Sequence, residues 1–160
     1  MEHYMTKEVL ISIKGLQFGE EDHEDELESI TTGTYYYKNG SHYVLYEEAT
    51  EGFDETSRNR LKFREHEMSL TKSGLVNVQM IFEENRKNMS SYHTPYGDIM
   101  IGIDTRTVEI EENQEQINLK VDYALEVNYQ HFADCKIDIC IRPKQSGVEL
   151  YVRFELVQLI

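Results

Sequence analysis

Apolar and polar residues alternate along most of this chain, and this period of two limits the fold more than any other feature. The clearest run is INLKVDYALEV at 117–127, where every second residue from Ile117 to Val127 is apolar. Alternation of this kind predicts a strand with one buried face. Helical periodicity is nearly absent, so we expect an all-β fold. The same period of two runs through residues 76–82, 99–103, 137–141 and 150–156.

Short turn motifs separate these runs. Asn39 and Gly40 lie between TYYYK and SHYVLY and predict a two-residue hairpin. About eight to ten strands joined by such turns predict an antiparallel, up-and-down β-barrel or a β-sandwich. We prefer the barrel, because closure removes exposed strand edges. Further turn signals stand at 73–74, 95–97, 113–114, 128–129 and 146–147.

Length and charge narrow the class of protein. The 160 residues fit a single domain, 1–160, in which 1–6 form a tail and 147–160 add a C-terminal strand. The net charge of -14 disfavours nucleic acid and anionic membranes as partners. The sequence contains no apolar run of membrane-spanning length and begins with no secretory pattern, so we expect an acidic cytoplasmic protein.

Residues with catalytic or metal-binding chemistry form no recognisable pattern. Cys135 and Cys140 differ by an odd number of residues, so on one strand they point to opposite faces and are expected to be reduced thiols. The six histidines include no pair at the i, i+2 or i, i+4 spacing of a local metal site. We therefore expect no metal and no cofactor. An enzyme is the least favoured interpretation, because no residue set can be nominated as catalytic.

The stretch SYHTPYGDIMIGI at 91–103 allows two interpretations. Residues 94–97 suit a β-turn with proline at its second position, which marks a strand end. The aromatic side chains around this turn either plug the end of the barrel or form the rim of a ligand entrance. In the second case, tyrosines of the 39–40 hairpin join them. The candidate ligand-binding residues are Tyr92, His93, Tyr96, Tyr36 and Tyr46.

A basic stripe stands out against the acidic composition. SRNRLKFREH at 57–66 places four cations on one face of a strand and Leu61 and Phe63 on the other. An inward stripe would expose these two side chains, at roughly 1.5 to 3 kcal/mol each, so we expect the stripe to face outward. There it can pair with acidic strands, or guide an acidic partner or the acidic loop 19–28 of another copy. The stripe consists of Arg58, Arg60, Lys62 and Arg64.

Four segments in this order carry a family resemblance: KEVLISIKGLQ, TGTYYYKNGSHYVLYEE, SGLVNVQMIFEENRKN and SYHTPYGDIMIGI. They resemble the YwiB-like family, small bacterial proteins of unknown function, over residues 7–128. The resemblance implies a lipocalin-like, calycin-type β-barrel and a bacterial origin, and it supplies no catalytic residue, ligand or partner. The chain departs from the family pattern beyond residue 142. It also has no Trp, so it lacks the glycine-x-tryptophan motif of lipocalins, which argues against their transport role.

Two functional hypotheses from different classes follow. In the first, the barrel interior binds a small, mostly apolar molecule. In the second, the chain is an interaction or assembly module, and the C-terminal strand at 147–160 joins two copies into a homodimer. A cavity larger than the side chains can fill would favour the first hypothesis.

Overall fold

The computed structural model describes residues 7–15 and 28–144, which form ten β-strands. Helices are not found in these two segments, and no helix of the described chain is long and apolar enough to cross a membrane. The prediction of an all-β fold is confirmed. The strands are β1 (Lys7–Lys14), β2 (Glu28–Lys38), β3 (Ser41–Ala49), β4 (Thr56–Arg64), β5 (Glu67–Gly74), β6 (Val78–Glu83), β7 (Arg86–Thr94), β8 (Gly97–Glu112), β9 (Ile117–Val127) and β10 (Gln130–Pro143).

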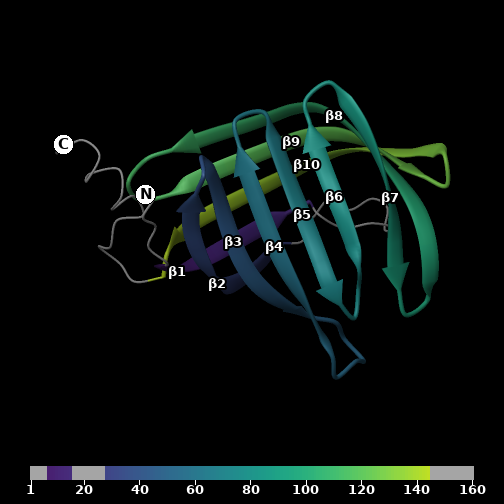
Figure 1. The fold of residues 1–160 in the computed structure, drawn as a ribbon, viewed down its shortest axis with the longest axis horizontal. Coiled ribbons are helices and arrows are strands. Elements are labelled where there is room, and N and C mark those ends of the chain that lie inside the picture. The colour runs from purple at the N-terminus through teal and green to yellow at the C-terminus, as the bar shows by residue number, and fades with distance from the viewer. Residues whose placement is uncertain (1–6, 16–27, 145–160) are drawn as a thin grey trace.

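The strands form one antiparallel sheet that curls into a nearly closed barrel. Its order is β6-β5-β4-β3-β2-β1-β10-β9-β8-β7, so every strand from β1 to β6 and from β7 to β10 pairs with its neighbour in the chain. The pairing of β1 with β10 joins these two halves. In Figure 1, β3 to β6 lie in front of β8 to β10. The expected up-and-down order is therefore confirmed.

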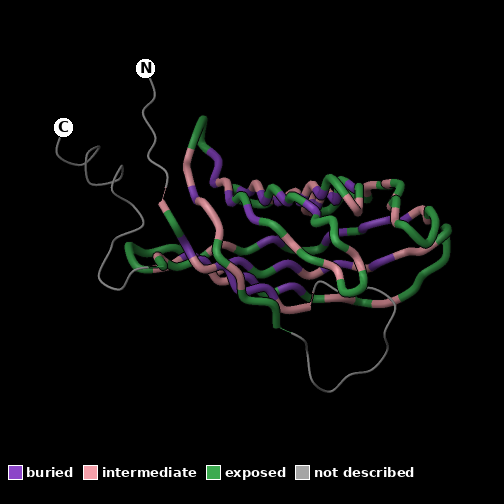
Figure 2. The backbone as a smooth tube through the Cα atoms, turned by 90° about the horizontal axis from the view of Figure 1, so that it is seen from below, coloured by how far each residue is buried: buried purple, intermediate pink, exposed green. Residues whose placement is uncertain are grey.

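The alternating residues fill the interior of the barrel. In β9, every second residue from Ile117 to Leu125 is buried, which is the pattern that its sequence predicts. Buried segments of both walls line the space between them (Figure 2). The largest buried side chains include Tyr35, Tyr123, Phe63 and Phe82, so aromatic rings from four strands pack in one core.

Within the described residues, turns lie close to the predicted positions, and three further connections with weaker signals follow β3, β4 and β6; the turn predicted at 146–147 lies outside the described residues. Asn39 and Gly40 have φ angles of 51° and 81°, the left-handed conformation of a hairpin turn that Asn and Gly favour. Pro95 and Tyr96 separate β7 from β8, as the TPYG motif predicts. Two of these connections, at 65–66 and 84–85, each place a single non-glycine residue at positive φ.

The barrel has a seam between β6 and β7. These strands form no ladder, and their backbones join through the bridge of Asn77 and His93, with two N–O distances of 2.9 Å. Side chains of β7 replace the missing ladder. Asn88 Nδ2 donates to the carbonyl of Ile81 at 3.4 Å, and the Ser90 hydroxyl donates to the carbonyl of Gln79. The seam is thus closed mainly by side chains.

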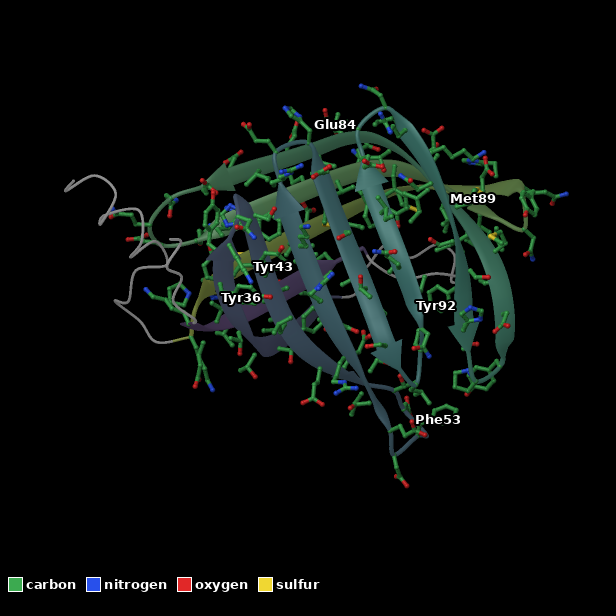
Figure 3. The ribbon with its side chains drawn as sticks, in the orientation of Figure 1. Tyr36, Tyr43, Phe53, Glu84, Met89 and Tyr92 are labelled. Atoms are coloured by element: carbon green, nitrogen blue, oxygen red, sulfur yellow. The ribbon has the colours of Figure 1, made fainter. Side chains whose placement is uncertain are left out.

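One carboxylate secures the upper end of this seam. β8 has a bulge at Arg106, and β7 begins opposite Thr105, so β8 continues beyond its partner strand. The backbone N–H of Val108 donates instead to Glu84 Oε2 at 2.8 Å. Figure 3 shows Glu84 at this end of the barrel. The side chain of Glu84 therefore supplies the acceptor that a neighbouring strand would otherwise provide.

Three predictions concern residues that the structure does not describe. They are the N-terminal tail at 1–6, the extra strand at 147–160, and most of the acidic loop at 19–28. These expectations lie outside the described residues.

Replacing Glu84 by alanine should lower the free energy of unfolding by about 1–3 kcal/mol, because it leaves the N–H of Val108 without an acceptor. Glu84→Gln keeps an acceptor oxygen and should recover most of this loss. Urea denaturation followed by circular dichroism measures both variants, with Glu65→Ala on the exposed neighbouring turn as the control. Equal stability of Glu84→Ala and the control would refute this role for Glu84.

Candidate functional site

The inward face of the barrel changes from apolar to polar along the strands β3, β4 and β5. Tyr46, Asn59 and Lys72 are direct partners in the register of these strands and form one row across the sheet. Glu48 lies two residues after Tyr46 on the same side of β3. Tyr92 of β7 points inward near the same end of the barrel (Figure 3). We call these five residues the polar end.

The polar end contains an ion pair between a buried ammonium group and a partly exposed carboxylate. Lys72 is only 8% exposed, and its Nζ lies 2.8 Å from Glu48 Oε1. The same carboxylate oxygen accepts a hydrogen bond of 3.3 Å from Asn59 Nδ2. Removing an ammonium group from water is expensive, and it is tolerated only when a counter-charge and further hydrogen bonds are at hand. Glu48 supplies the counter-charge and one hydrogen bond for Lys72, whose ammonium group carries three donors.

The unusual feature of the polar end is the side-chain oxygen of Asn59. The residue is 2% exposed, and its Oδ1 has no hydrogen bond partner among the described residues. Nearly all buried polar atoms in proteins are paired, because an unpaired one costs about 1–3 kcal/mol. Asn59 Oδ1 is thus an available acceptor on the register partner of Lys72. The pair offers a ligand one acceptor and one donor within a small space.

The two tyrosines of the polar end remain protonated over the physiological pH range. Burial raises the pKa of Tyr46; a side-chain hydrogen bond with Asn59 lowers this pKa, and the charge of Glu48 raises it. Burial also raises the pKa of Tyr92, and the charge of Glu48 raises it further. Both phenols thus keep their O–H groups. They offer hydrogen bonding and ring surface, and they do not serve as bases.

The structure separates the five residues that the sequence nominates for ligand binding. Tyr46 and Tyr92 both face inward at the polar end, and both sense the charge of Glu48. His93 faces outward and forms an ion pair with Asp98, with 3.0 Å between Nδ1 and Oδ1. Tyr96 is 85% exposed on its turn, and its ring contacts the edge of Phe53. Their binding roles stay predictions.

Tyr36 lies on the outer face of β2, apart from Tyr46 and Tyr92, and its binding role stays a prediction. Its neighbour Tyr35 is buried inside, so Tyr36 projects from the outer face of β2. There it stacks on Tyr43 of β3, with 4.7 Å between ring centres. The alternation of β2 determines this position, because adjacent residues of a strand face opposite sides.

Three residues of the polar end are not among the binding residues predicted from the sequence, although the sequence contains a signal for two of them. Asn59 shares its parity on β4 with Leu61 and Phe63, and Lys72 shares its parity on β5 with Leu70. A polar residue on an otherwise apolar face is the informative exception to the pattern. Glu48 gives no comparable signal, because acidic residues are frequent in this chain.

The barrel interior does not offer the apolar cavity that an apolar ligand would need. Three hollows of the described chain are all open to solvent: two are lined mainly by outward-facing residues of β2 to β6, one of which also reaches Tyr46 and Asn59, and the third lies around His42 and Glu112. The middle rows of the barrel are filled by buried aliphatic and aromatic side chains. Close packing of this kind leaves few voids. The polar end is thus a better candidate site than the centre of the barrel.

The opposite end also holds buried polar groups, but these are paired. His42 Nδ1 lies 2.9 Å from the hydroxyl of Tyr35, and His42 Nε2 lies 3.0 Å from Glu112 Oε2. The imidazole ring stacks on Phe63 at 4.7 Å between centres. Both ring nitrogens are therefore engaged. This network ties β2, β3 and β8 together and closes the barrel.

Metal-binding and thiol chemistry find little support in the described residues. Within 7–15 and 28–144, no three His, Cys, Asp or Glu side chains are placed to hold one ion. Cys135 and Cys140 are both free thiols. Burial raises the pKa of Cys135, a hydrogen bond with Tyr123 lowers it, and the charge of Asp134 raises it. The net increase keeps Cys135 in the poorly nucleophilic thiol form.

Asn59→Leu should raise the free energy of unfolding by about 1 kcal/mol, because it removes an unpaired buried oxygen and loses only long hydrogen bonds. Leu61→Asn is the matched change, since it places the same amide two residues further along the inner face of β4. It should lower the free energy of unfolding by about 3 kcal/mol. Urea denaturation measures both variants. A loss of stability in Asn59→Leu as large as in Leu61→Asn would show that the amide serves the fold.

Comparison with known proteins gives a family and a fold. The family described as "Domain of unknown function (DUF1934)" matches residues 11–139. The crystal structure of the ywiB protein from Bacillus subtilis is similar, with a TM-score of 0.73, 19% sequence identity, and coverage of 88% of this chain and 94% of that chain. At this identity the likeness shows the fold, and it confirms the YwiB-like resemblance. No curated protein matches the chain. Because the match spans most of its length, the chain belongs to the DUF1934 family.

Proposed function

We propose that this barrel is a binding protein for a small polar molecule, which it holds at the polar end. The observation that carries the proposal is the buried, unpartnered Oδ1 of Asn59 beside the buried ammonium group of Lys72. A ligand that donates an N–H or O–H to Asn59 and accepts a hydrogen bond from Lys72 would satisfy both groups. The proposal differs from our sequence-based expectation of an apolar ligand in the barrel.

Charge balance narrows the class of ligand. Lys72 and Glu48 neutralise each other, so the polar end has little net charge of its own. A ligand of high charge would leave that charge uncompensated in a poorly hydrated site. The ligand we propose is therefore neutral or zwitterionic, with at least one donor and one carbonyl or carboxylate acceptor. The rings of Tyr46 and Tyr92 supply its apolar contacts.

The polar end lies within reach of solvent. The side chain of Glu48 is 42% exposed, and Tyr92 is only half-buried. Tyr92 also belongs to β7, which borders the seam that few backbone hydrogen bonds hold. A ligand can thus approach from the end of the barrel without unfolding a ladder.

The cellular location we propose is the bacterial cytoplasm. Cys135 and Cys140 are unpaired, and free thiols persist in a reducing compartment. This observation supports the proposal, and the family resemblance supports the bacterial origin.

The alternative function is a homodimeric assembly module that uses the C-terminal strand. Its support is the alternation of apolar residues at 150–156 in the sequence. Truncation after residue 146 should then convert a dimer into a monomer of lower mass, measured by size-exclusion chromatography with light scattering. A full-length chain that is already monomeric would reject the alternative.

Native mass spectrometry of the protein from its own host tests the ligand proposal. We expect a species heavier than the 18.9 kDa monomer by one small molecule, which is released on denaturation. Asn59→Leu should lose this added mass, and Ser69→Ala, on the outer face of β5, should keep it. A wild-type protein without added mass, or an adduct that Asn59→Leu retains, would contradict a ligand bound at Asn59.

A further inference from the structure

The basic stripe of β4 faces outward, and most of it is unpaired. Arg58, Arg60 and Arg64 are exposed, and Lys62 is partly exposed. The expected pairing with acidic neighbours occurs only at Arg64, which contacts Glu67 with 2.5 Å between Nε and Oε1. Among the carboxylates of the described residues, none forms an ion pair with Arg58, Arg60 or Lys62. In a chain with a net charge of -14, three neighbouring cations without an ion pair to a described carboxylate are unexpected, although Glu47 lies opposite Arg58 in the register.

Two tyrosines hold this stripe in place. Tyr43 of β3 lies beside the cations, with Lys62 Nζ at 5.7 Å and the guanidinium carbon of Arg60 at 6.0 Å from its ring centre. Tyr36 stacks on Tyr43 with an angle of 6° between the ring planes. Figure 3 shows the two tyrosines side by side on β2 and β3. Cation–π contacts of this kind restrict the long side chains before a partner binds.

A broad hollow lies over part of the same face. It has a volume of about 1050 Å³ and is lined mainly by residues of β2 to β5, including Arg58 and Arg60. The remaining lining includes the hydroxyl groups of Thr34, Thr71 and Ser73, the carboxylate of Glu47, and Glu8 in its ion pair with Lys144. The guanidinium groups of arginine suit carboxylates, because they can donate two parallel hydrogen bonds. We call Arg58, Arg60, Lys62, Tyr36 and Tyr43 the basic face.

We propose that the basic face binds an extended acidic peptide segment of a partner protein. Alternate residues of a strand lie about 6.8 Å apart, so Arg58, Arg60 and Lys62 form a row of evenly spaced cations. An extended peptide with a carboxylate at every second residue has the same spacing. Its intervening side chains would point away from the sheet, because adjacent residues of a strand face opposite sides.

The arrangement favours a peptide over single-stranded nucleic acid. Proteins that bind single strands stack bases on free aromatic faces. Here Tyr36 stacks on Tyr43, and Lys62 and Arg60 lie close to the same ring. The net charge of -14 opposes every anionic partner at long range, and this repulsion is weaker for a short peptide with few carboxylates than for a polyphosphate chain or a second copy of the whole chain.

Fluorescence anisotropy with a labelled peptide of alternating glutamate and threonine tests the proposal on the full-length protein. We expect saturable binding that weakens as salt is added. The variant Arg58→Gln/Arg60→Gln/Lys62→Gln should weaken binding about tenfold, because exposed ion pairs each contribute little and three are lost together. The matched control is Lys120→Gln/Lys136→Gln/Arg142→Gln, which removes three cations from β9 and β10. It should change the affinity less than about twofold.

Several outcomes would overturn the proposal. Equal effects of the two triple variants, or equal binding of a peptide with glutamine in place of glutamate, would show that the basic face does not recognise carboxylates. Tighter binding of a single-stranded oligothymidine through the same three cations would make the face a nucleic-acid surface. Sedimentation of the protein alone completes the test. A dimer that only the stripe variant loses would identify a second copy as the occupant.

Discussion

The pairing of β1 with β10 is the contact on which the barrel depends. β1 pairs with β2 on one side and with β10 on the other, so it joins the first six strands to the last four. Without it the chain would form two open sheets with exposed edges. The chain leaves β1 at Gly15, where φ is 87° and an added Cβ would lie 2.0 Å from the carbonyl oxygen of Lys136. Only glycine allows this approach between β1 and β10.

Because the sheet closes into a barrel, each strand has one inner and one outer face. The two faces of β4 carry different kinds of residues. Its inner face carries Leu61 and Phe63 for the core and Asn59 for the polar end. Its outer face carries Arg58 and Arg60, which form no ion pair with a described carboxylate. The proposed ligand and the proposed peptide would therefore contact opposite sides of one strand. Asn59 forms hydrogen bonds with Glu48 and Tyr46, and the ligand proposal rests on its side-chain oxygen, which has no partner among the described residues.

The fold was largely predictable, because the period of two and the Asn39-Gly40 turn both depend on local geometry. β7 gave a weak signal, since its inward residues Asn88 and Ser90 are polar and bind backbone groups of β6. The outward position of Tyr36 was not predictable, because tyrosine suits either face of a strand, and three successive tyrosines hide which parity is buried. The polar end could not be assembled from the sequence, since its residues come from four strands. Their proximity depends on register and closure, which local patterns do not specify.

The central claim is that Asn59 Oδ1 and Lys72 form a ligand site. A high-resolution crystal structure of the protein, purified from the organism that encodes it, tests this claim most directly. The account predicts density for a small organic molecule at the polar end, within hydrogen bond distance of both groups. Density for an ordered water molecule that satisfies Asn59 Oδ1, or an Asn59 side chain turned to another protein partner, would contradict it. Either result would show that the polar end belongs to the fold.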